Sequence, residues 1–411
     1  MFKHGRRLKK KLATSVAIIF IYILGQNILL PYVQADIGEI QPNQAFFQML
    51  KAVYGSNRQS LSVFSLGIMP YMMASILLML KNLGNSDKKH IPLIPIKKQI
   101  KILTLLICII MSFLRTQHYA YTTYFFNNSI LTRIFTMTVL ITGAFTIVWL
   151  ADMNTGKGLG GMVIIIIVNI LKTIVGNILE VIEGFQTGIY GSKEDICRIL
   201  VLVLIGVVSM ITILFLEESE LRIPIQKVMI YNEMSRDNYM AVKLDPIGIQ
   251  PMMYVMAFYV IPYFVFNILA ASFPDKKVFL VLAEKVQLNN LTGISVFLLI
   301  FFLLTVALAM VEISPSDIAE QMQKSGDCII GLRPGRETQE YIRAVVLTLS
   351  ICSAVILGIL IGIPMVLRVL WNLPQELVMI PMSLMFMGGI TRNVFLEARV
   401  VERIEDYQEV L

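Results

Sequence analysis

A short polar loop carries the residues of this chain best suited to chemistry. Residues 331–337 read GLRPGRE, in which Arg333 and Arg336 flank Pro334 and Gly335. A guanidinium is a planar fork of donors that fits carboxylates, phosphates and backbone carbonyls, while glycine and proline favour a tight turn. The pattern predicts a rigid, positively charged tip that docks onto a partner, and a solvated turn is the alternative interpretation.

Enzyme and metal-site patterns are absent from the sequence. It contains no HExxH and no GxSxG, and its four cysteines and three histidines are isolated from one another. Gly156–Gly161 resembles a phosphate-binding loop but lacks the GK[ST] ending and follows a predicted helix, so a sharp turn between two helices explains it better. We therefore expect no catalytic residue, no metal and no cofactor.

The elements that must position this loop are membrane helices. Hydrophobic residues make up 56% of 411, charged residues only 15%, and the mean hydropathy is +0.72. A span needs about 20 mainly apolar residues, and ten windows satisfy this: 12–30, 65–80, 99–115, 131–150, 159–179, 195–216, 247–269, 292–312, 342–363 and 376–396. Lys172 is the clearest intramembrane charge, and snorkelling to the interface competes there with a functional role.

Two segments need separate interpretation. The stretch QAFFQMLKAV, residues 44–53, is apolar on one helical face but too short to span, which predicts a half-helix folded back into the protein. The basic start and apolar run before Val33-Gln34-Ala35 also fit a signal peptide, but the run is long and is broken by polar residues and Pro31, which favours a retained span. Ten spans divide into two sets of five, 1–190 and 191–411, which would be inverted repeats.

Lys and Arg counts predict the orientation of the chain. With the N-terminus inside, 24 of the 35 basic residues lie on the cytoplasmic side, six of them in residues 1–11 and six in 81–101. Both termini and the two long loops, 217–245 and 313–341, are then cytoplasmic. We expect a multi-pass protein of the bacterial cytoplasmic membrane.

Four ordered motifs resemble those of one family, the SecY protein-conducting channels. GIMPYMMASI (67–76) is similar to the family's GIMPYxxASI, and WLADMNTGKGLGGMVIIII (149–167) is similar to WLGExITxxGIGNGxSIII. FLEESELRIPIQ (215–226) resembles FVExxxRRIPVQ, and residues 314–342 resemble NPxxxAxxLKKxGxxIPGIRPGxxTxxYL. The chain is identified as a member of this family, whose ten-helix count also agrees.

The resemblance implies an hourglass pore between two five-helix halves, closed at its waist by an apolar ring and covered outside by a plug half-helix. Matching the motifs puts the plug at about 43–53 and the ring on helices two, five and seven. Helix ten also contributes, with Leu384 and Met387 as candidates. The ring residues are Ile68, Met72, Val163, Ile167 and Met253, and the plug residues are Phe46, Phe47, Met49 and Leu50. Ordinary core packing is the alternative for Met253.

Helices two and seven flank the family's lateral gate, through which signal sequences leave the pore. The resemblance assigns gate positions to Pro70, Met73, Ser75, Pro251 and Tyr254. Few hydroxyl or amide side chains occur there. A less polar gate costs more to wet, so we hypothesise that the channel stays closed until a suitable signal sequence engages.

The two long loops dock the SecA ATPase or the ribosome in this family. The expected docking residues are Arg333, Arg336, Arg222, Lys227, Arg236 and Lys243. The family also implies a small SecE-like membrane subunit, with a SecG-like or other accessory subunit left open, and a secreted preprotein as substrate.

Departures from the family pattern narrow the assignment. The chain is short, and residues 82–98 lack the family's GRRKI-xQYTRY pattern. These differences favour the accessory SecY branch of Gram-positive bacteria, which exports serine-rich glycoproteins. A diverged housekeeping SecY channel is the alternative, and an inverted-repeat secondary transporter is the alternative of another class.

Overall fold

The structure is a computed structural model of the whole chain and describes the greater part of it. The described residues are 6–30, 33–34, 61–83, 93–116, 120–121, 129–187, 193–226, 238–248, 250–272 and 276–410. The predicted plug residues Phe46, Phe47, Met49 and Leu50, and the basic residues Lys227 and Arg236, lie outside the described residues.

Each predicted span coincides with one long helix. The ten helices are α1 (Arg6–Asn27), α3 (Met69–Leu83), α4 (Leu93–Thr116), α5 (Ser129–Lys157), α6 (Val163–Gln186), α7 (Lys193–Glu218), α8 (Gln250–Ser272), α10 (Leu291–Glu312), α12 (Arg336–Trp371) and α13 (Gln375–Val410). Within the described part of the chain, seven of them are long and apolar enough to cross a bilayer by length and composition alone. Two shorter helices are α9 (Lys277–Lys285) and α11 (Pro315–Ser325).

Several helices extend beyond their predicted spans, and the last two are examples. The ninth span was expected to begin near 342, but α12 begins at Arg336 and runs to Trp371. The tenth was expected to end near 396, but α13 continues to Val410. Both extensions are amphiphilic rather than apolar, and a hydropathy window ends where the lipid-facing part ends, not where the helix ends.

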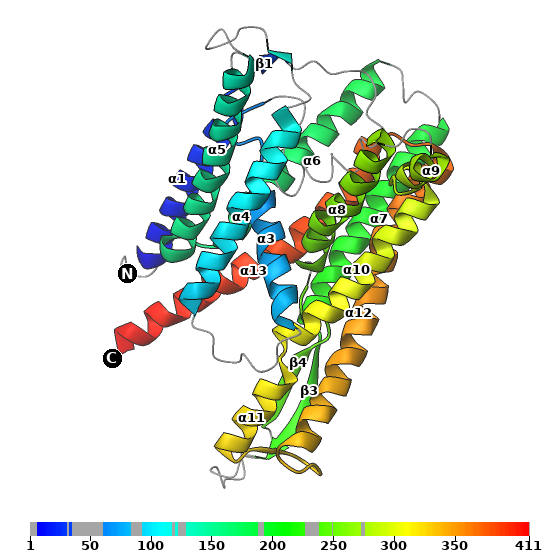
Figure 1. Cartoon of the computed structure of the whole chain (residues 1–411). Helices are drawn as coiled ribbons and strands as arrows, with labels where there is room; N and C mark the ends of the chain where they lie inside the picture. Colours follow the sequence, from blue (N-terminus) through cyan, green and yellow to red (C-terminus); the bar gives the residue numbers. More distant parts are fainter. Residues whose placement is uncertain are drawn as a thin grey trace.

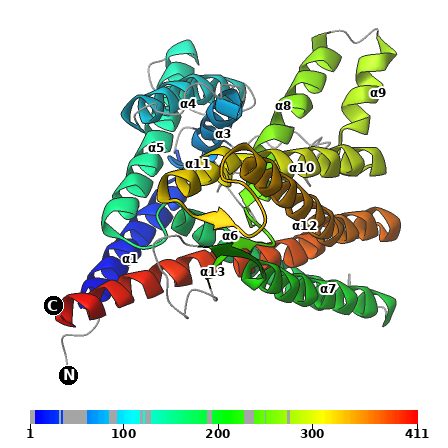
Figure 2. The ribbon, with the colours of Figure 1, turned by 90° about the horizontal axis from the view of Figure 1, so that it is seen from below.

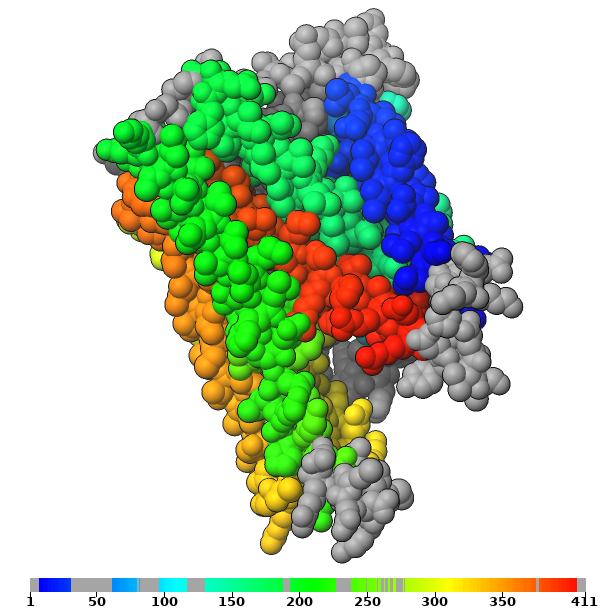
Figure 3. All heavy atoms as spheres, turned by 180° about the vertical axis from the view of Figure 1, so that it is seen from behind, coloured from blue at the N-terminus to red at the C-terminus, as the bar shows by residue number. Residues whose placement is uncertain are grey.

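The helices form two groups that α13 connects. In Figures 1 and 2, α1, α3, α4 and α5 lie on one side and α7, α10 and α12 on the other. Figure 3 shows α13 crossing the rear face, between α6 and α7 and toward α1. Close approach to α7 depends on glycine, because a Cβ at Gly206 would lie 3.0 Å from the Cα of Pro381 in α13.

Strands occupy a small part of the described chain. β1 (Val33–Gln34) pairs with β2 (Ala120–Tyr121). A second, antiparallel sheet has the order β4-β3-β5, with β3 at Glu220–Gln226, β4 at Tyr239–Lys243 and β5 at Cys328–Ile329. This sheet, together with α11 and the start of α12, projects beyond the helix bundle (Figure 1). We call residues 219–243 and 314–341 the arm.

Outward faces of the bundle are apolar, as a bilayer requires. On α7, for example, the side chains of Leu200, Leu204, Val208, Ile211 and Phe215 are all exposed. They recur every three or four residues, so they form one stripe along the helix. Hydrogen bonds between helices occur inside the bundle: buried Asn169 of α6 accepts hydrogen bonds from Tyr22 Oη (2.8 Å) and Gln26 Nε2 (3.0 Å) of α1.

Candidate functional site

One large apolar cluster, the central cluster, includes residues of α3, α6, α8 and α13 and extends into α10 and α12. Ile68, which immediately precedes α3, is 0% exposed, Met72 of α3 is 8% exposed and Met253 of α8 is 4% exposed. Val163 and Ile167 of α6 are half-buried and pack against the same cluster. All five residues predicted for the ring therefore belong to this cluster or pack against it, although they are separated by up to 185 positions in the sequence.

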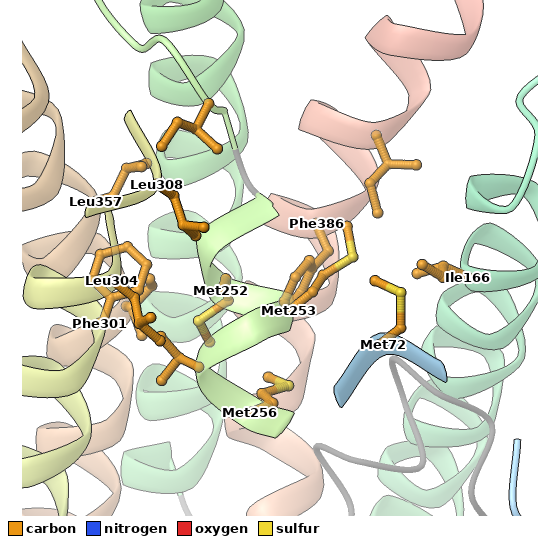
Figure 4. Packing of buried hydrophobic residues seen from close by; sticks show 14 of the residues in the cluster. Met72, Ile166, Met252, Met253, Met256, Phe301, Leu304, Leu308, Leu357 and Phe386 are labelled. Atoms are coloured by element: carbon orange, nitrogen blue, oxygen red, sulfur yellow. The ribbon is translucent and has the colours of Figure 1, made fainter. Parts of the chain in front are cut away.

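The fourth helix, α13, enters this cluster through one of its two candidate residues. Met387 packs against the central cluster, whereas Leu384 packs in a separate cluster with Leu202, Leu377 and Ile380. Phe386, which the sequence reasoning did not single out, is buried beside Met253 (Figure 4). The sequence alone could offer its neighbour Met387 only as one of several apolar candidates, because no family motif matches this helix.

Methionine is unusually frequent in this cluster. Buried methionines occur on α3 and α8 in runs three or four residues apart, and again on α13. They are Met69, Met72, Met73, Met252, Met253, Met256, Met379, Met382 and Met385. Figure 4 shows Met72, Ile166 and Met253 pointing toward a common centre from three different helices. An unbranched thioether has three rotatable bonds, so such a surface can be reshaped without breaking polar contacts.

The seam between α3 and α8 contains the predicted gate residues. Pro70 and Pro251 are each the second residue of their helix, where a missing N–H costs nothing, and both are buried. Met73 is 8% exposed, and Tyr254 is half-buried. The Ser75 hydroxyl donates to the carbonyl of Met72 at 2.9 Å, in its own helix, so it does not make the seam polar.

The tip of the arm is a turn held by the helix that follows it. Gly331 and Gly335 have φ of +88° and +112°, a region that favours glycine. The Arg333 N–H donates to Glu337 Oε2 at 3.2 Å, and the Thr338 hydroxyl donates to the Arg333 carbonyl at 2.8 Å. Thr338 is thus a buried residue inside α12 that holds the turn before it.

Both arginines at this tip are exposed. Arg336 Nε lies 3.0 Å from Glu340 Oε1, one turn along α12, and the Arg336 side chain is 90% exposed. An exposed pair of this kind contributes little to stability, typically about 0.3–0.5 kcal/mol. The Arg336 side chain is therefore available to a partner.

A second basic surface lies on the arm sheet. Register places Arg222 of β3 beside Ala241 and Pro224 beside Tyr239 of β4, so Arg222 and Tyr239 share one face of the sheet. The Arg222 guanidinium lies 4.7 Å from the centre of the Tyr239 ring and 2.9 Å from Glu220 Oε1. Lys243 is also exposed at the base of β4.

The glycine-rich stretch between α5 and α6 is a packed turn. The Asn154 side-chain amide donates to the carbonyls of Leu159 and Gly161, both at 2.7 Å, while Asn154 Oδ1 accepts from Ser15 of α1 at 2.7 Å. A Cβ at Gly158 would lie 1.9 Å from Asn154 Oδ1. The turn is filled by the protein's own side chains, as expected of a connection between two helices.

A family model decides the identity of the fold. The model of the SecY family matches residues 62–393. The chain belongs to the SecY family. Its match covers α3 to α13, including the central cluster and the arm.

Curated relatives of this SecY-family chain carry a more specific description. The accessory Sec system protein translocase subunit SecY2 of Streptococcus pneumoniae serotype 4 is 29% identical over 412 residues, covering 98% of each chain. The protein of the same description from Streptococcus agalactiae serotype III is 30% identical over 357 residues, covering 87% of this chain and 84% of the relative. The chain is an accessory-type SecY translocase channel subunit and a multi-pass membrane protein.

Solved structures of SecY-type channels share the fold. A chain described as "The structure of a protein conducting channel" has a TM-score of 0.65 at 14% identity, covering 96% of this chain and 93% of the other. The Sec61 chain of a canine ribosome-channel complex has a TM-score of 0.61 at 14% identity, covering 96% and 93%. The sequence prediction of an all-helical, ten-span SecY architecture is confirmed.

Proposed function

We propose that the central cluster is the waist of a pore that passes unfolded polypeptides across the cytoplasmic membrane. The convergence of Ile68, Met72, Val163, Ile167, Met253 and Met387 from α3, α6, α8 and α13 carries this proposal. A narrow apolar constriction excludes water and ions by dewetting. Flexible side chains such as methionine can part around a polypeptide and close again.

The two halves of the channel are residues 1–190 and 191–411. In this proposal they separate along the seam between α3 and α8, where Pro70, Met73, Ser75, Pro251 and Tyr254 form a lateral gate. Packing of α13 on both α6 and α7 supports a closed side opposite the seam. The plug, at about 43–53, covers the waist from outside.

A weakly polar seam is proposed to keep the gate closed. The hydroxyl of Ser75 bonds within its own helix, and the neighbouring side chains from α3 are methionines. Wetting such a surface costs free energy, so opening requires a signal sequence to fill it. Replacing Met252 or Met256 by serine should therefore raise the spontaneous ion leak and broaden the range of accepted signal sequences; an unchanged leak and range would contradict the hypothesis.

The arm is proposed to dock a SecA-type ATPase, since the channel itself is no enzyme and needs an energy source. Exposed Arg333, Arg336, Arg222 and Lys243 provide the docking surface, with Lys227 and Arg236 on the intervening loop. Both termini and the arm lie in the cytoplasm. A SecE-like subunit, and a SecG-like or other accessory subunit, complete the assembly in the membrane. The cargo is a serine-rich glycoprotein preprotein.

A crosslinking scan tests the docking proposal. Photo-crosslinking residues replace Arg333 and Arg336 in native membranes, and captured proteins are identified by mass spectrometry. We expect a SecA-type ATPase dedicated to an accessory system. Capture of general SecA together with ribosomal proteins would support a housekeeping channel instead, and capture of neither would overturn the role of the tip.

A further inference from the structure

A buried polar joint connects the arm to the membrane helices. Glu217 lies near the end of α7, just before β3, and Asp245 lies two residues after β4. Register pairs Glu220 with Lys243 at the base of this hairpin, so the two acids stand where its two strands enter the bundle. Their exposed fractions are only 6% and 2%.

Asp245 links three elements through one carboxylate oxygen. Its Oδ1 accepts a hydrogen bond from the Gly248 N–H at 3.1 Å and another from the Ser353 hydroxyl at 2.9 Å. Gly248 lies two residues before α8 begins, and Ser353 is a fully buried residue of α12. The end of β4 is thereby fastened both to the start of α8 and to the middle of α12.

Glu217, which precedes the other strand of the hairpin, also lies close to Gly248. Gly248 has a φ of +67°, and a Cβ placed on it would lie 3.0 Å from Glu217 Oε1. Arg392 of α13 has its Nε 4.0 Å from Glu217 Oε2, and its Nη1 donates to the Leu214 carbonyl at 3.2 Å. The beginning of β3 is thus held against α8 and α13.

This arrangement is not the one that stability alone would favour. Among the described residues, Glu217 Oε1 and Asp245 Oδ2 are buried oxygens with no hydrogen-bond donor. Burying a carboxylate oxygen without a donor is costly, and the negative charges of Glu217 and Asp245 repel each other. A joint with such opposed contacts is easily shifted by a small displacement of the hairpin.

We propose that Glu217, Asp245, Gly248, Ser353 and Arg392 form a transmission joint that converts docking on the arm into movement of α8. The inference rests on the proposed docking function of the arm. Met253 and Tyr254 lie in the first turn of α8, about 5 Å along its axis from its start. A rotation of that turn moves one ring residue and one gate residue together. The five joint residues are positioning residues, because their proposed effect on the ring and the gate is exerted through α8.

The test measures binding of a ligand to the arm and movement at the seam between α3 and α8 separately. A fluorophore and a quencher replace Tyr71 of α3 and Tyr254 of α8, which both pack against the central cluster, in a chain without its native cysteines. The reconstituted channel is then titrated with the SecA-type ATPase, and separately with an antibody fragment selected against the arm tip. Affinity and the fluorescence change at saturation are measured for each ligand.

Four variants define the expected result. Asp245→Ala removes the acceptor of both hydrogen bonds, and Ser353→Ala removes one donor. Both variants should still bind either ligand, with an affinity changed by no more than the lost coupling, about 10-fold, and should lose most of the fluorescence change at saturation. Asp245→Asn keeps the Oδ1 acceptor and should retain most of the fluorescence change. Ser350→Ala is the matched control, because Ser350 is equally buried on α12 but bonds only to Leu347 of its own helix.

The outcomes distinguish the two proposals. A normal fluorescence change in Ser353→Ala and Asp245→Ala, or no change in the wild type with the antibody fragment bound, would overturn the joint. If the antibody fragment produces a change that depends on Asp245 while the ATPase does not bind, the joint stands and the proposed docking partner is wrong. If Asp245→Ala does not fold, the comparison of Ser353→Ala with Ser350→Ala decides.

Discussion

The backbone N–H of Gly160 donates a 2.7 Å hydrogen bond to Glu397 Oε2. Gly160 belongs to the turn between α5 and α6, and Glu397 belongs to α13, so this contact joins a turn of the first half of the chain to its last helix. The turn fits closely, since a Cβ at Gly160 would lie 3.0 Å from Val394, also of α13. The last helix is therefore fixed to the first half of the channel as well as to the second.

Loss of the Glu397 carboxylate should weaken this attachment. Glu397→Ala leaves the Gly160 N–H without its acceptor, and we expect a loss of about 1 kcal/mol, since the carboxylate is exposed. Glu397→Gln keeps an oxygen acceptor and should lose less. Thermal unfolding of the purified protein in detergent measures both, and equal midpoints for all three proteins would show that the contact is not stabilising.

Two neighbouring glycines should respond oppositely to alanine. Gly158→Ala places a methyl group against Asn154 Oδ1 and Ser15, so we expect destabilisation of about 1–3 kcal/mol. Gly156 has nothing within 4 Å of its Cβ position and lies in the last turn of α5, so Gly156→Ala should be neutral or stabilising. The same unfolding assay compares them, and a Gly158→Ala protein as stable as wild type would contradict the packed turn.

Truncation of the proposed ring should open a leak. Met387→Ala removes a side chain that packs on the central cluster, and we expect an increased ion conductance in planar bilayers. Leu384→Ala, one turn earlier on α13, removes an apolar side chain from a different cluster and should leave conductance low. A higher conductance for Leu384→Ala than for Met387→Ala would mean that α13 lines the pore through Leu384.

Asp245 should make the stability of the protein depend on pH. Burial raises the pKa of Asp245 above its ordinary value of 3.8, despite hydrogen bonds from Ser353 and the loop backbone that lower it. The folded chain therefore holds this proton more tightly than the unfolded chain does. The resulting stabilisation is complete below pH 3.8 and is lost as the pH rises through the raised pKa.

Asp245→Asn removes this titration and keeps the acceptor oxygen. We expect the variant to be more stable than wild type at pH 7, with the difference shrinking as the pH approaches 4. Unfolding midpoints measured between pH 4 and 7 provide the comparison. A constant difference across that range would show that Asp245 titrates as an ordinary surface aspartate.

Much of the fold could be predicted because each membrane-spanning helix requires a long run of apolar residues, which is easy to recognise in the sequence. Apolar windows located all ten long helices, including α3, whose span is short. The same signal ends at the membrane surface, so it missed the extension of α13 to Val410 and the early start of α12 at Arg336. Strands of the arm were also missed, because β5 is two residues long and is specified only by its pairing with β3.

The packing of the proposed ring residues in one cluster was predictable where a motif fixed the register. Ile68, Met72 and Val163 lie within or beside the matched motifs, and they do pack in one cluster. No such motif matches α13, so only their packing in the structure distinguishes Leu384 from Met387. Glu217 and Asp245 escaped notice because an acid beside a basic loop resembles any solvated residue until its burial is known.

Pairing between β3 and β5 has a consequence for the order in which the protein is made. Ile225 pairs with Ile329, and α8, α9, α10 and α11 all lie between them in the sequence. The arm sheet cannot be completed until those four helices have been synthesised, and ordering so long a loop is slow. In a nascent chain the proposed docking surface is thus incomplete until most of the second half has been made.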